Sequence, residues 1–158
     1  MNNEPMREFM QLAIDLSVAN VAEGGGPFGA VIVKDGEVVA TGVNRVTANC
    51  DPTAHAEVSA IRAACQRLGS FRLEGCVCYT SCEPCPMCLS ALYWAGVREI
   101  WYGNTKKDAD AIGFGDDFIY QEIARPYTER AIPLRPLMRD EAQAAFRAWT
   151  LKEDKIEY

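Results

Sequence analysis

Two valine-rich segments on either side of an Asp-Gly pair constrain the fold of this chain more than any other feature. They span residues 28–33 and 38–43 and flank Lys34-Asp35-Gly36-Glu37. Asp-Gly between two apolar runs is a strong hairpin signal, because these residues suit the tight turn that joins antiparallel strands. The sequence therefore predicts two antiparallel strands early in the chain.

Helix signals lie before and after this hairpin. Residues 4–23 carry apolar side chains at helical spacing, and Gly24-Gly25-Gly26 ends that predicted helix. A second helix is predicted to carry Pro52 in its first turn, with Asp51 or Thr53 as its cap, and to run to about residue 68. A strand at 76–80, a helix at 86–94 and a strand at 99–103 are predicted next, followed by an irregular polar stretch at 104–128. The chain then ends with a strand at 132–137, weakly predicted because of its two prolines, and a helix at 140–152.

This order of elements predicts an α/β fold in which one mixed sheet is covered by helices on both faces. The 158 residues, 49% of them apolar, suit a single domain over residues 1–158, and no repeat or linker divides them. In such sheets the strand ends carry the functional site. The helices that begin near Pro52 and Pro86 each follow a strand, so we expect their N-termini to meet at one end of the sheet.

Charge and cysteine content narrow the function classes. The net charge is −6, and no basic run is longer than Lys106-Lys107, so we expect no nucleic-acid partner. No apolar stretch approaches membrane-spanning length and the first residues lack a secretion pattern, which predicts no membrane partner and a cytoplasmic location. Seven cysteines in such a chain favour metal or thiol chemistry over a disulfide framework.

Cys85 and Cys88 stand three residues apart where a helix is predicted to begin. Both sulfurs then project from one side of that helix, and its N-terminus favours the thiolate form. His55 is the only imidazole in the chain and also lies near a predicted helix start. Three protein ligands suit tetrahedral zinc and leave one position open for water, as in catalytic zinc sites.

Glu57 follows His55 by two residues, which keeps the two side chains off a common helical face, but the Glu57 carboxylate can still reach a water above the metal. We expect it to act as a general acid/base that takes a proton from that water and delivers it to a leaving group. Cys82 leaves an alternative open, because a closed site of three cysteines and His55 would be structural. Pro84 and Pro86 constrain the backbone there and make that closure less favourable.

His55-Ala56-Glu57 followed by Pro84-Cys85-Pro86-Met87-Cys88 is the signature of zinc-dependent nucleobase deaminases. With the segments 25–33, 51–57, 80–88 and 113–120, and the terminal Tyr158, the chain resembles the cytidine deaminase superfamily, and within it the bacterial guanine deaminases. The resemblance implies a three-layer α/β/α fold with a five-stranded mixed sheet. It also implies one zinc ion per subunit on His55, Cys85 and Cys88, proton transfer by Glu57, and hydrolysis of guanine to xanthine and ammonia.

The resemblance further implies base contacts by Phe28, Asn44, Ala56, Asp116 and Tyr158. A ring at Phe28 can stack on a base or simply pack in the core, and Asn44 can contact the base edge or serve a turn. A carboxylate complements the N1–H and amino group of guanine, and either Asp116 or its neighbour Asp117 can provide it.

In relatives of this kind the C-terminal segment crosses to a partner subunit, so the resemblance implies a domain-swapped homodimer in which Tyr158 lines the neighbour's pocket. A free purine base is the expected substrate. The alternatives are deamination of guanosine, of cytosine or of adenosine in tRNA, and, in a different class, a non-enzymatic module built on structural zinc.

Overall fold

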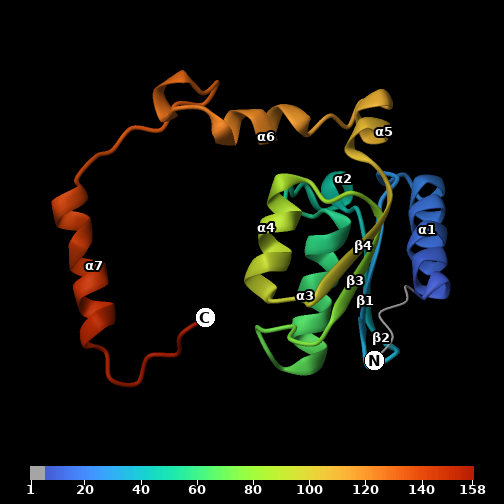
Figure 1. Ribbon diagram of the computed structural model, residues 1–158, viewed down its shortest axis with the longest axis horizontal. Coiled ribbons are helices and arrows are strands. Elements are labelled where there is room, and N and C mark those ends of the chain that lie inside the picture. Colours follow the sequence, from blue (N-terminus) through green and yellow to red (C-terminus); the bar gives the residue numbers. More distant parts are fainter. Residues whose placement is uncertain (1–5) are drawn as a thin grey trace. The chain divides into compact units, whose positions relative to one another are not determined.

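The computed structural model describes residues 6–158, which divide into two compact units, residues 6–117 and residues 118–158 (Figure 1). The elements of the first unit, in chain order, are α1 (Arg7–Ala22), β1 (Gly29–Lys34), β2 (Glu37–Val43), α2 (Val46–Asn49), α3 (Ala56–Leu68), β3 (Val77–Cys82), α4 (Pro86–Ala95), β4 (Glu99–Asn104) and α5 (Lys106–Ala111). Within residues 6–158, no helix is both long enough and apolar enough to cross a lipid bilayer.

The predicted hairpin is confirmed and lies at one side of the sheet. β1 and β2 pair antiparallel, and the turn between them places Asp35 and Gly36 at φ of 51° and 81°. The strand order is β2-β1-β3-β4, with β1 antiparallel to β3 and β3 parallel to β4. The sheet is therefore mixed, as the sequence predicts.

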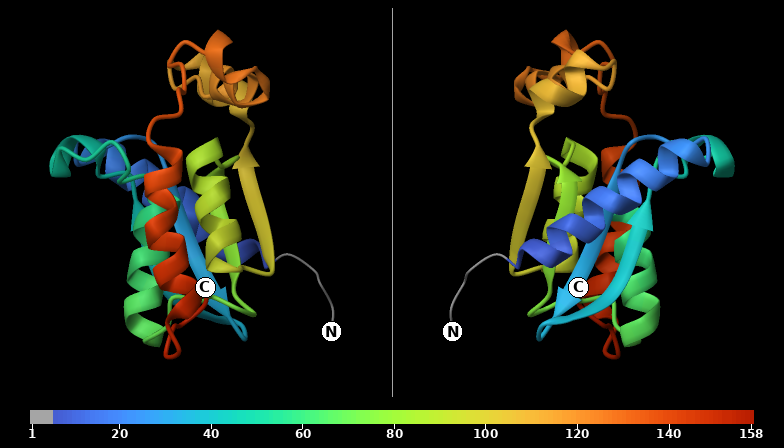
Figure 2. Two further views of the ribbon diagram at one scale, coloured as in Figure 1. Left: turned by 90° about the vertical axis from the view of Figure 1, so that its left-hand side faces the viewer. Right: turned by 90° about the vertical axis from the view of Figure 1, so that its right-hand side faces the viewer.

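Helices cover both faces of this sheet within the first unit (Figure 2). Because side chains alternate along a strand, Ala30 and Ile32 of β1 point to one face and Val31 and Val33 to the other. The first face packs against α3 and α4, and the second packs against α1 around Phe9. The three layers expected from the sequence are present.

The sheet has four strands in the described residues, so the expectation of a fifth is wrong for this structure. The segment 132–137 forms no strand. Pro133 and Pro136 lack the backbone N–H that a strand interior donates to its neighbour, which explains why the weak strand signal fails.

Two helix boundaries also differ from the prediction. α3 begins at Ala56, because residues 51–54 form a turn in which the Asp51 carboxylate accepts a hydrogen bond from the Thr53 N–H at 2.8 Å. The stretch 104–128, expected to be irregular, contains two helices, α6 (Asp117–Ala124) and α5, whose start is capped reciprocally by Thr105 and Asp108. Local capping by polar side chains therefore moves one helix start and creates another.

The second unit contains α6 (Asp117–Ala124), which begins at its boundary, the 3₁₀ helix η1 (Tyr127–Glu129), and α7 (Arg139–Leu151). The predicted last helix is thus confirmed as α7. No residue of the segment 118–158 is buried, and large apolar side chains such as Phe146 and Leu137 are exposed. This unit has no hydrophobic core of its own.

Candidate active site

The sheet topology explains why residues thirty positions apart in the sequence meet. β2 and β3 are both antiparallel to β1, so they run in the same direction and end at the same edge of the sheet. α3 follows β2, α4 follows β3, and the two helices are in contact. The expectation that these helix N-termini meet at one end of the sheet is confirmed.

His55, Cys85 and Cys88 lie together at this edge. His55 and Cys85 each occupy the residue just before their helix, and Cys88 lies in the first turn of α4. Nδ1 of His55 is 3.5 Å from Sγ of Cys85 and 3.5 Å from Sγ of Cys88. In a tetrahedral site, Zn–S bonds of about 2.3 Å and a Zn–N bond of about 2.05 Å place nitrogen and sulfur about 3.6 Å apart. The donor set therefore fits zinc in both chemistry and spacing.

The ionisation of these ligands is coupled through their contacts. Hydrogen bonds from the side chain of Cys88 and, to a smaller extent, from His55 lower the pKa of Cys85 to about 4. The contact between the two cysteines raises the pKa of Cys88, and the hydrogen bond to Cys85 raises the pKa of His55. The Cys88 backbone N–H also donates to Sγ of Cys85 at 3.4 Å. These contacts favour one thiolate, and a bound zinc ion would displace the proton from the second thiol.

Cys82 does not join this group. Its Sγ is directed at the backbone oxygen of Thr105, 3.8 Å away, and burial raises the pKa of its thiol to about 11. The group of candidate metal ligands found in residues 6–158 comprises His55, Cys85 and Cys88. This geometry supports a site with three protein ligands and an open fourth position.

Glu57 lies in the first turn of α3, and 6% of it is exposed. Burial raises the pKa of its carboxyl group, while hydrogen bonds with the side chains of Cys88 and Thr80 act in the opposite direction. Contact with Cys88 places this carboxyl group beside the metal ligands. A buried carboxyl group with a raised pKa is suited to give and take a proton near neutral pH.

The residues expected to contact the base differ in their burial, in their contacts and in the unit to which they belong. Phe28 packs partly on the core and meets the Phe114 ring edge-on at 5.0 Å between centroids. Asn44 is buried at the end of β2, and its Oδ1 accepts the Val46 N–H at 3.2 Å, so it does serve a turn. Ala56 is fully buried in the first turn of α3. Tyr158 belongs to the second unit and is mostly exposed.

The two neighbouring acids differ sharply. Oδ1 of Asp116 is buried and has no hydrogen-bond partner among residues 6–158, and burial raises the pKa of this carboxyl group. Asp117 instead forms an ion pair with Lys106, with 3.2 Å between Oδ1 and Nζ. A buried acceptor without a partner is costly unless something binds it, so Asp116 is the better candidate for a ligand contact.

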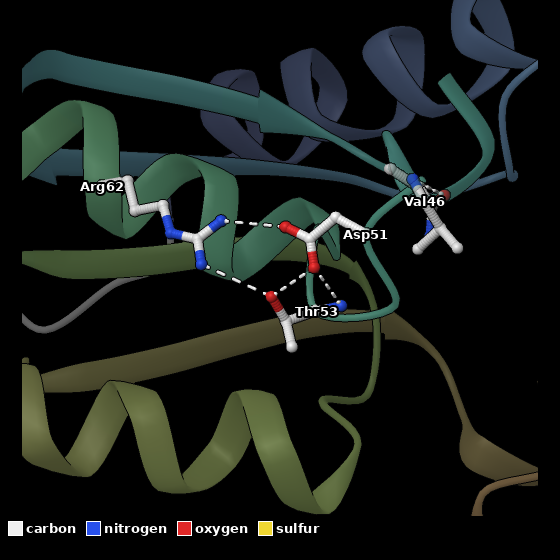
Figure 3. Close-up of polar contacts among 5 residues, drawn as sticks. Val46, Asp51, Thr53 and Arg62 are labelled. Carbon is white, nitrogen blue, oxygen red and sulfur yellow. Dashed lines mark hydrogen bonds and ion pairs between the residues drawn. The ribbon is translucent and has the colours of Figure 1, made fainter. Parts of the chain in front are cut away.

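Sequence reasoning missed two groups that position the site. The first is Thr80, whose hydroxyl donates to Glu57. Thr80 lies two residues after Cys78 in β3, so both side chains point to the face that packs on α3, and this alternation was the signal that could have identified it. The turn before His55 is held by Asp51, Thr53 and Arg62, whose contacts are drawn in Figure 3. No pairing of this kind can be read from sequence spacing alone.

Comparisons with known proteins agree with this site. Residues 3–104 match the cytidine and deoxycytidylate deaminase zinc-binding region. The chain is 50% identical to guanine deaminase of Bacillus subtilis over the whole of both chains, and 40% identical to the tRNA-specific adenosine deaminase of Agrobacterium fabrum over 72% of this chain and 74% of that protein.

Solved structures give the same result. The X-ray structure of the Bacillus subtilis guanine deaminase superposes with a TM-score of 0.94 at 50% identity, covering 100% of this chain and 99% of that one. Guanine deaminase of Nitrosomonas europaea gives a TM-score of 0.67 at 33% identity, covering 93% of this chain and 88% of that one. The chain therefore belongs to the family of cytidine and deoxycytidylate deaminases, whose shared region binds zinc.

Proposed function

We propose that the protein is a zinc-dependent guanine deaminase that converts guanine and water to xanthine and ammonia. The observation that carries this proposal is the group His55, Cys85 and Cys88 with zinc-like spacing and buried Glu57 beside it. Similarity to a guanine deaminase over the full length directs the choice of substrate.

Each residue of the site has a definite part in this reaction. His55, Cys85 and Cys88 would hold zinc, which, when bound, lowers the pKa of a coordinated water towards about 7 and so supplies a nucleophile at neutral pH. Glu57 takes a proton from the attacking water and delivers it to the amino group on C2 of guanine. That amino group then leaves as ammonia, and Glu57 returns to its starting state.

The base is oriented by contacts from several elements. Phe28 offers a ring for stacking, and the Asn44 amide can contact the base edge. Guanine presents two donors side by side, N1–H and the 2-amino group, and the unpartnered oxygen of Asp116 is a suitable acceptor for them. Ala56 lines the site at the start of α3. We choose Asp116 over Asp117 because Lys106 already pairs with Asp117.

The proposal includes a homodimer in which the segment 118–158 docks on a second copy and brings Tyr158 to its site. Its support is that this segment buries none of its own residues and exposes apolar side chains along α7. Such a segment requires a surface to cover it. Mixing E57A chains with Y158A chains tests this. In a swapped dimer the Y158A chain keeps its own Glu57 and receives Tyr158 from the E57A chain, so one site is complete and turnover returns. In an unswapped protein every site lacks one of the two residues and stays inactive.

A substrate screen tests the activity itself. Purified protein loaded with zinc is given guanine, guanosine, cytosine and adenosine-containing tRNA, and ammonia release is measured for each. We expect release from guanine, and loss of that release in E57A with zinc content unchanged. Release from tRNA alone, or from none of the four, would reject the proposal.

A further inference from the structure

The Thr80 hydroxyl lies between two parts of the site that come from different elements. It is 1% exposed, and its Oγ1 is 3.1 Å from Oε1 of Glu57 and 3.1 Å from the backbone oxygen of Cys82. Glu57 belongs to α3 and Thr80 to β3, so this contact ties helix to sheet. Cys82 ends β3 at the loop that leads to Cys85.

A hydroxyl group has one hydrogen to donate and lone pairs with which to accept. Thr80 can therefore donate to Glu57 when that side chain is a carboxylate. When Glu57 carries the transferred proton on its other carboxyl oxygen, Oε1 remains an acceptor, and the Thr80 hydroxyl can still donate to it. Both forms of Glu57 keep a hydrogen bond to the same atom without movement of the backbone.

A fixed orientation matters because the carboxyl group turns easily about its last torsion, for which the preference is broad. Proton transfer needs the donor and acceptor atoms within hydrogen-bond reach, and small displacements are costly in rate. In the described residues, Thr80 is the partner in β3 that holds Oε1 of Glu57.

We propose that Thr80 is a positioning residue for proton transfer by Glu57, whose carboxyl group it holds in one orientation before and after the proton is taken up. This inference rests on the proposed function, because it concerns a step of that reaction. Thr80 itself does not contact the reacting atoms in this scheme.

A matched residue allows a structural role to be separated from this one. Ser81 follows Thr80 in β3, is 2% exposed, and its hydroxyl accepts the Gly29 N–H at 3.0 Å. It is an equally buried hydroxyl with a hydrogen bond to the backbone and no contact with Glu57. S81A is therefore the control, because it removes a buried hydroxyl from β3 without removing a contact to Glu57.

The test compares wild type, T80V, T80S and S81A. Zinc content, kcat and KM for guanine, and Kd for hypoxanthine are measured; hypoxanthine is guanine without the amino group that leaves, so it binds without being deaminated. For T80V we expect normal zinc content, KM and Kd within about threefold of wild type, and kcat lower by roughly 10- to 100-fold. T80S should recover most of this loss, and S81A should keep kcat within about twofold.

The results distinguish failure of this inference from failure of the proposed function. Wild-type kcat in T80V overturns the inference alone, as does a loss of zinc or of hypoxanthine binding large enough to account for the lower kcat. If T80V does not fold, T80S and T80A replace the comparison, because these two differ only in the hydroxyl, and equal kcat values overturn the inference. Wild-type protein that does not deaminate guanine overturns the proposed function first and this inference with it.

Discussion

Replacing Gly42 by alanine should disable the site by displacing a helix, without touching a reacting group. At Gly42, β2 passes so close to α3 that an added Cβ would lie 2.3 Å from the backbone oxygen of Ala56 and 2.4 Å from the nitrogen of Ala60. Ordinary contact begins at 3.4 Å, so 3.4 − 2.3 = 1.1 Å of separation is missing. The obstructing atoms are backbone, which cannot rotate away as a side chain can.

The start of α3 must then move by about 1 Å. Overpacking of this kind costs about 1–3 kcal/mol, which lowers Tm by roughly 2–12 °C in a protein of this size. The displaced turn carries His55 and Glu57, whereas Cys85 and Cys88 stay with α4. Zinc sites hold ligand distances to within about 0.2 Å, so we expect G42A to lose zinc and about 100-fold or more of its turnover.

Gly29 provides the matched control on the neighbouring strand. An added Cβ there would lie 2.5 Å from the backbone oxygen of Ala13 in α1, which covers the other face of the sheet. G29A should therefore lose stability as G42A does but keep its zinc. The assay is zinc content after dialysis, together with the Tm of each variant. Full zinc content in G42A, or equal zinc loss in G29A, would refute the reasoning.

Three further variants test single contacts. E57Q should lower kcat by about 10²- to 10⁴-fold while zinc content stays unchanged. D116N should lower kcat/KM for guanine by about tenfold or more, whereas D117N, which breaks the exposed pair with Lys106, should change it by less than about threefold; equal effects would contradict this choice of acid. Hydrogen bonds from Thr53 lower the pKa of Asp51, so its contribution to stability is present above the unfolded pKa and is lost as pH falls through the folded pKa. The difference in Tm between wild type and D51N should accordingly be present at pH 7 and disappear in acid; a difference that grows on acidification would contradict this sign.

Local signals in the sequence were sufficient for the elements whose ends are set by neighbouring residues. The Asp35-Gly36 turn and the start of α4 at Pro86 appear where predicted, because turn and cap chemistry acts within a few residues. The start of α3 was predicted too early for the same kind of reason. The Asp51 side chain stabilises its own turn instead of capping the helix, and nothing in the sequence distinguishes these two uses.

What could not be predicted depends on pairing at long range. The candidate metal ligands were predicted because the chain has a single histidine and a pair of cysteines, Cys85 and Cys88, at helical spacing, but their meeting depends on β1 lying between β2 and β3. The contact of Thr80 with Glu57 and the difference between Asp116 and Asp117 arise only once the elements have packed. The fifth strand failed because apolar residues alone do not supply the N–H groups that a ladder requires.

The residues proposed for zinc binding and proton transfer lie inside the region that matches the family, whereas the residue proposed to select guanine lies outside it. The family match ends at residue 104, so it contains the zinc ligands and Glu57, and it also contains Phe28 and Asn44. A stacking ring and an amide can serve many planar bases, and a relative named for tRNA adenosine shares 40% identity with this chain. Adenine has no N1–H beside a 2-amino group, so an acceptor for that pair of donors favours guanine over adenine. Asp116, outside the matched region and with a buried oxygen that lacks a partner, is therefore where selection for guanine is most readily tested.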